Sequence, residues 1–77
     1  MYSTQYSADF EAMVDEVNKA CLAVLDSMNT ANADYKRTET KEGFYDFALE
    51  VLYALHPHEN GQSARRAAQI ITHYYFS

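Results

Sequence analysis

The sequence predicts an all-α fold, a compact three-helix domain with a long connection between the first and second helices. In three separate segments, apolar residues recur at alternating spacings of four and three, which places them on one face of an α-helix. The chain has only two Gly and one Pro, too few turn residues for an all-β sandwich with its many hairpins. Its 77 residues allow one domain, residues 1–77.

The first helix is expected near residues 8–28. Ser7 is a suitable N-cap, and Asp9 and Glu11 would lie in the first turn, where the helix dipole favours negative charge. One apolar stripe follows, made of Phe10, Val14, Val17, Cys21, Val24 and Met28. We expect this stripe, widened by Met13, Ala20 and Leu25, to face the core.

Residues 29–40 interrupt the helical pattern. Polar side chains dominate this segment, and Tyr35 is its one large apolar candidate. A connection of about a dozen residues is long for a compact domain. We expect it to be the most mobile segment, with room for an extra turn of helix.

The second helix is expected near residues 41–56. It would begin at Thr40 or Lys41 and end before Pro57, because a proline pushes the preceding residue out of the helical conformation. Apolar side chains cover more than half of its circumference, which indicates a central helix with two neighbours. They are Phe44, Ala48, Val51 and Leu55, flanked by Phe47, Leu52, Ala54, Tyr45, Leu49 and Tyr53.

The third helix is expected near residues 62–75, after a turn that contains Pro57 and Gly61. Its inward face is predicted to consist of Ala64, Ala67, Ala68, Ile71 and Tyr75, with Ile70 and Tyr74 beside them. The three alanines would let it approach the second helix closely. A polar stripe on the opposite face is made of Gln62, Arg66, Gln69 and His73.

Composition excludes several classes of protein. No apolar run approaches the roughly 20 residues of a membrane span, and no basic-then-apolar leader is present, so no membrane association is expected. The single cysteine, Cys21, rules out an internal disulfide and a multi-cysteine zinc site. We therefore expect a reducing, cytoplasmic location.

Catalytic motifs are missing from the sequence. It has no Gly-rich phosphate loop, no nucleophile elbow and no Asp-rich calcium loop. Glu11 and Asp15 lie one helical turn apart, but on the solvated face, whereas a catalytic pair of carboxyl groups needs a desolvated cleft. His56 and His58 flank Pro57, which restricts their convergence on a metal ion. We expect no enzymatic activity, no cofactor and no metal.

A helix, a turn and a second helix also suggest a small helix-turn-helix DNA-binding regulator. Its base-reading and phosphate-binding residues would be Gln62, Arg65, Arg66 and Gln69. The charge of residues 41–77 is −1, however, and DNA binding needs a positive field. Direct nucleic-acid binding is therefore the alternative hypothesis.

Acidic residues are concentrated in the first half of the chain. Residues 1–40 carry −4 of the formal net charge of −5. Such a face either keeps the protein soluble or provides a docking surface for a partner with a basic surface. The residues expected to steer that partner are Asp9, Glu11, Asp15 and Glu16.

Seven Tyr and four Phe exceed what one small core can enclose. Tyrosine is enriched at protein interfaces, because it combines a large rigid surface with a polar tip. The anchors expected at a partner are Tyr6, Tyr35, Tyr45 and Tyr53. A further hypothesis is a homo-oligomeric structural protein, with a homodimer contact near Tyr45, Leu49 or Tyr53.

In size, acidity, tyrosine content and lack of catalytic motifs, the whole chain resembles small acidic single-domain proteins of bacteriophages and other mobile elements. Those proteins disable host enzymes or defence systems. The resemblance implies a binding-only inhibitor that occludes a basic or nucleic-acid-binding surface of a host complex. A CRISPR effector, a restriction or recombination nuclease, or RNA polymerase would be such a target.

Overall fold

The computed structural model describes residues 8–77, and within them every regular element is helical. The elements are α1 (Ala8–Ser27), α2 (Ala33–Lys36), the 3-10 helix η1 (Arg37–Glu39), α3 (Lys41–Leu55) and α4 (Gly61–Phe76). The prediction of an all-α protein is confirmed. The predicted count of three helices is too low, because the connection between the first and second predicted helices contains α2 and η1.

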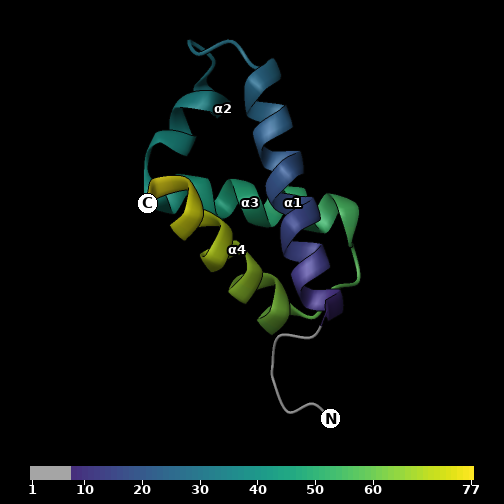
Figure 1. The fold of residues 1–77 in the computed structure, drawn as a ribbon. Coiled ribbons are helices and arrows are strands. Elements are labelled where there is room, and N and C mark those ends of the chain that lie inside the picture. Colours follow the sequence, from purple (N-terminus) through teal and green to yellow (C-terminus); the bar gives the residue numbers. More distant parts are fainter. Residues whose placement is uncertain (1–7) are drawn as a thin grey trace.

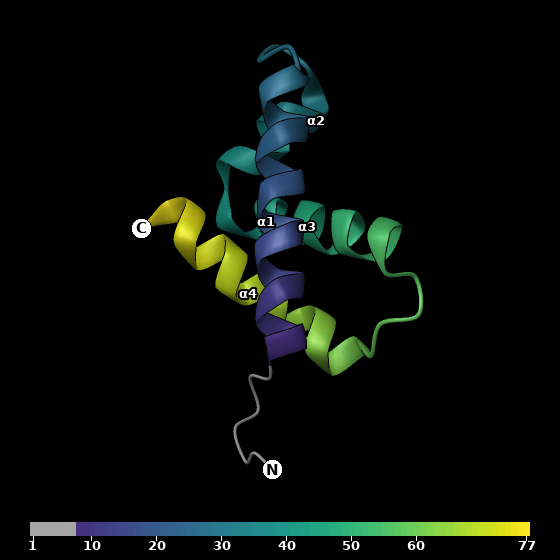
Figure 2. The ribbon, with the colours of Figure 1, turned by 45° about the vertical axis from the view of Figure 1, so that its right-hand side comes forward.

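Three long helices enclose the core (Figure 1). α3 crosses behind α1 and α4, and these two diverge from neighbouring N-terminal ends, as the two ribbon views agree (Figures 1 and 2). The most extensive helix contact is between α3 and α4. Because α1 and α4 spread apart in front of α3, the side chains between them are only partly covered.

α1 buries one face along its length. The buried residues are Met13, Val17, Cys21 and Leu25, at a constant spacing of four. The predicted stripe was wrong at Val24, which is 36% exposed. The stripe of buried residues lies to one side of the predicted one, so the neighbouring helices cover Leu25 rather than Val24. The predicted N-cap, Ser7, lies outside the described residues.

The connection after α1 is folded through its second half. Asn32 caps α2 by accepting a hydrogen bond from the amide of Asp34 at 2.7 Å. Thr38 in η1 is buried, and its hydroxyl donates to the carbonyl of Tyr35 at 2.6 Å. This segment is therefore packed on the core, whereas the sequence predicted a long connection with room for a single extra turn.

α3 begins at a capped N-terminus and ends before a proline. The hydroxyl of Thr40 accepts a hydrogen bond from the amide of Gly43 at 3.0 Å, which satisfies one of the unpaired amides of the first turn. The buried residues are Phe44, Phe47, Ala48 and Leu52. Leu55 was predicted to face the core and is 43% exposed, because it lies in the last turn of the helix.

α4 packs closely through small side chains. Asn60 accepts hydrogen bonds from the amides of Gln62 and Ser63 at 2.8 and 3.2 Å, and so caps the helix. The buried residues are Ala64, Ala67, Ala68, Ile71 and Thr72. The polar stripe predicted on the opposite face is exposed.

A contact between distant parts of the chain fixes the turn after α3. The carboxylate of Glu16 on α1 lies 2.8 Å from Nε2 of His56, the first residue after α3. This contact holds the turn between α3 and α4 beside the first half of α1. It thereby helps to place the start of α4 next to the start of α1.

Candidate protein-binding site

All five acidic side chains of α1 are exposed: Asp9, Glu11, Asp15, Glu16 and Asp26. With Lys19 as the single basic residue, α1 carries a net charge of −4. The acids do not form one uniform face. Glu11 and Asp15 border the gap between α1 and α4, whereas Glu16 contacts His56 on the side of the turn after α3.

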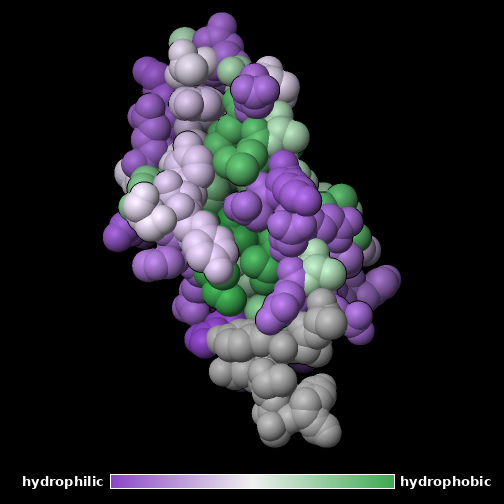
Figure 3. Space-filling model, in the orientation of Figure 1, coloured by the Kyte–Doolittle hydropathy of each residue, from purple (hydrophilic) through white to green (hydrophobic). Residues whose placement is uncertain are grey.

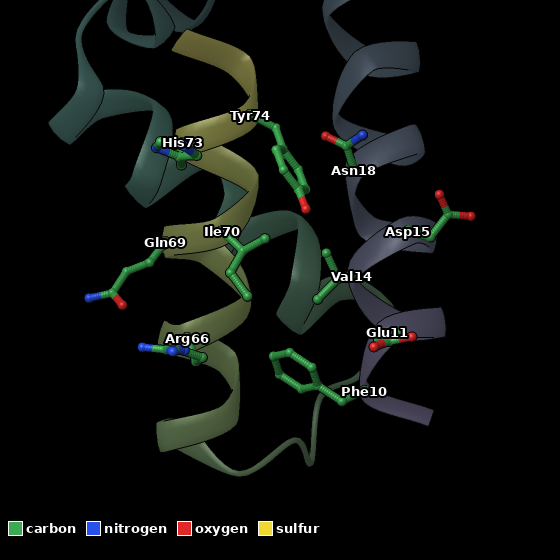
Figure 4. Close-up of a pocket in the computed structure, with 10 residues that line it drawn as sticks. All are labelled: Phe10, Glu11, Val14, Asp15, Asn18, Arg66, Gln69, Ile70, His73 and Tyr74. Atoms are coloured by element: carbon green, nitrogen blue, oxygen red, sulfur yellow. The ribbon is translucent and has the colours of Figure 1, made fainter. Parts of the chain in front are cut away.

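A groove of about 650 Å³ lies between α1 and α4. Phe10 and Val14 from α1 and Ile70 and Tyr74 from α4 point toward one another across it (Figure 4). The space-filling view shows an apolar strip along this face, with hydrophilic side chains on both sides (Figure 3). An apolar floor between polar rims is the usual composition of a protein-binding surface.

The rim formed by α4 carries residues that the alternative hypothesis assigned to DNA. Arg66 and Gln69 line the groove together with His73. Arg65 lies elsewhere: a Cβ placed on Gly61 would be 3.2 Å from its Nη1 and 3.9 Å from the hydroxyl of Tyr53. The structure therefore separates the two arginines and brings Arg66 beside the groove.

The charges of the two helices are opposite in sign. α4 contains Arg65 and Arg66 and no acidic residue, so its net charge is +2. The acidic residues of α1 and the basic residue of α4 were proposed for rival functions, and here they form the two rims of one groove. Sequence alone could not reveal this, because it does not show which helices are neighbours.

The tyrosines fall into two groups. Tyr35 and Tyr45 are half-buried against the core, whereas Tyr53 is 37% exposed. Tyr6 lies outside the described residues. Tyr74, which was predicted to lie beside the inward face of its helix, is 61% exposed and is the most exposed of the large hydrophobic side chains described. In the sequence, the exposure of Tyr74 could have been predicted from the polar residues Gln69 and His73, which precede it on α4.

Tyr75 was predicted to be buried and is 38% exposed. One side of its ring stacks on Phe44, with 4.2 Å between the ring centroids. Phe44 also meets Phe47 and Phe76 edge-on. This aromatic cluster closes the core at the C-terminal end of α4.

Chemically reactive groups are scarce in the part of the chain that the structure describes. It contains no group of three or more His, Cys, Asp or Glu placed to hold a metal ion. Burial raises the pKa of the Cys21 thiol to about 11, which keeps it protonated and unreactive at neutral pH. None of the helices described combines the length and the apolar character that a membrane crossing requires.

Comparisons with protein-family models, curated proteins and solved structures gave no match.

Proposed function

We propose that the protein is a non-catalytic binding module that docks on a basic surface of another protein and occludes it. The observation that carries the proposal is the exposure of every acidic side chain on α1, which gives this helix a net charge of −4 at the protein surface. An acidic surface of this kind attracts a basic partner and speeds the encounter. Nucleic-acid-binding surfaces are the basic surfaces that this charge suits best.

The groove beside α1 supplies the contact that follows the encounter. Electrostatic attraction alone gives little net affinity at an exposed surface, so a stable complex needs apolar anchors. Tyr74 and the apolar floor of the groove lie next to Glu11 and Asp15. An inhibitor of a host complex such as a CRISPR effector or nuclease, acting in the reducing cytoplasm, needs only these two features.

Affinity capture tests this function. The protein is immobilised and exposed to a bacterial lysate, and the bound proteins are identified by mass spectrometry. Tyr74→Ala removes the groove anchor, and Leu55→Ala is a matched control, because Leu55 is exposed at the end of α3 and does not line the groove. We expect the same partner with the wild type and with Leu55→Ala, and its loss with Tyr74→Ala. Equal capture by all three forms would contradict the proposal.

A titration with duplex DNA separates this function from the helix-turn-helix alternative. We expect no binding at moderate salt, because the rim of α1 would repel phosphates. Binding that Arg66→Glu abolishes would instead show that the exposed stripe of α4 contacts DNA, and it would overturn the proposal.

A further inference from the structure

The two rims of the groove between α1 and α4 carry opposite charges at one level, where the basic Arg66 lies across from the acidic Glu11. In the view onto the groove, Arg66 on α4 lies across from Glu11 on α1, and Gln69 lies across from Asp15 (Figure 4). An occupant whose charges complement both rims presents basic groups to Glu11 and Asp15 and an acidic group to Arg66. It must also bring apolar side chains to the floor between them.

A second copy of this chain has that distribution. A two-fold axis along the groove would lay α1 of each copy over α4 of the other, whereas an axis across the groove would place acidic helix on acidic helix. With the first arrangement, Glu11 of each copy faces Arg66 of the other, and each contact occurs twice. The charges of the two copies therefore complement each other when the two-fold axis runs along the groove, and they repel when it runs across the groove.

The apolar surface continues past the groove, which makes it long enough for such a contact. Leu22 on α1 is exposed, and with Leu25, Met28, Tyr35 and Tyr75 it lines a second hollow near the end of α1. From Phe10 to Ser27 the helix rises about 26 Å. Four helices brought together face to face would bury this strip in the manner of a helical bundle.

We infer that, in the absence of its partner, the protein forms a symmetric dimer in which a second copy occupies the groove between α1 and α4. The dimer does not depend on the proposed function. One consequence does rest on the proposed function: because the dimer would cover Tyr74, self-association and partner binding would compete for the same surface. Dilution would then favour the partner-binding form.

Charge exchange between two variants gives the sharpest test. In the first variant, Glu11→Lys and Asp15→Lys make both rims basic. In the second, Arg66→Glu and Gln69→Glu make both rims acidic. Sedimentation equilibrium is measured from about 1 μM to about 500 μM, the range of weak dimers. We expect the wild type to dimerise, each variant alone to dissociate at least tenfold more readily, and an equimolar mixture of the two to form a heterodimer with affinity near that of the wild type.

Controls keep the outcome specific to the groove. Glu42→Lys with Asp46→Lys changes the net charge of the protein as much as the first variant, but on α3, and should leave the dimer unchanged. Tyr74→Ala should weaken it at least tenfold, and Tyr53→Ala should not. Far-UV circular dichroism verifies that each variant is helical.

Two results would overturn the inference. One is a wild-type protein that stays monomeric over the whole range. The other is a dimer that Tyr53→Ala dissociates and Tyr74→Ala leaves intact, since that would place the contact on α3. Neither result bears on the capture experiment, because a failure of that experiment would contradict the proposed binding function and leave the dimer untouched.

Discussion

The guanidinium of Arg37 in η1 donates two hydrogen bonds to the carboxylate of Glu50 on α3, at 3.0 and 2.7 Å. The guanidinium also lies 5.9 Å from the ring centroid of Phe47. Because Arg37 lies within the connection between α1 and α3, this pair attaches that connection to the central helix. It complements the burial of Thr38, the next residue in the chain.

The Arg37–Glu50 pair should make stability depend on pH in the acidic range. The hydrogen bond from Arg37 lowers the pKa of Glu50 below its ordinary value of 4.5 and raises that of Arg37. A carboxyl whose pKa is lower in the folded state stabilises the fold above the ordinary value, and this contribution disappears as the pH falls through the folded-state pKa. Glu50 is exposed and solvent screens the pair, so we expect Glu50→Gln to cost at most about 1 kcal/mol.

The measurement is urea unfolding of the wild type and Glu50→Gln at several pH values. The difference between them should be largest above pH 4.5 and should shrink to nothing as the pH falls through the lowered pKa of Glu50. A difference that stays constant down to strongly acidic pH would show that the substitution acts through packing.

Gly43 should be the less replaceable of the two glycines. A Cβ at Gly43 would overlap the backbone carbonyl oxygen of Arg37, which cannot move without shifting η1. At Gly61 the nearest atom belongs to the flexible side chain of Arg65, at 3.2 Å. Alanine favours a helix over glycine by about 1 kcal/mol. We nevertheless expect Gly43→Ala to destabilise the protein by about 1–3 kcal/mol, and Gly61→Ala to change its stability by less than about 0.5 kcal/mol. Thermal unfolding of the two variants distinguishes these outcomes; equal effects would contradict the close approach of η1 and α3.

Local sequence signals predicted the helices better than they predicted burial. Thr40 caps the start of α3 and Pro57 follows its end, and both effects depend on nearby backbone, so these ends fall near the predicted residues. The burial of a periodic stripe depends on where neighbouring helices lie, and this explains the errors at Val24 and Leu55. Thr38 gave no apolar signal, because its burial depends on a hydrogen bond to Tyr35. The groove could not be predicted, because it requires α1 and α4 to be adjacent.

Val17 and Val24 provide a direct comparison of the sequence pattern with the structure. Both belong to the predicted stripe, but Val17 is fully buried and Val24 is 36% exposed. Val17→Asp would place an unpaired charge in the core, at a cost comparable to the total stability of about 4–12 kcal/mol expected for this length. We expect it to unfold the protein and Val24→Asp to leave it helical, as judged by circular dichroism. Unfolding by both substitutions would show that Val24 is buried, as the sequence pattern predicted.

The acidic rim of α1 should control how fast the proposed partner binds. Glu11→Lys with Asp15→Lys reverses the charge beside the groove, and we expect the association rate constant to fall about tenfold at low salt, with a smaller change in dissociation. Added salt should reduce the difference from the wild type, because exposed charges are screened beyond about 10 Å at 0.1 M. The measurement is binding kinetics with the captured partner, at concentrations where both forms are monomeric. The control is Glu42→Lys with Asp46→Lys, which makes the same change in net charge on α3. If the control slowed association equally, the net charge of the protein rather than the rim of α1 would attract the partner, and the groove would lose its assigned role in the encounter.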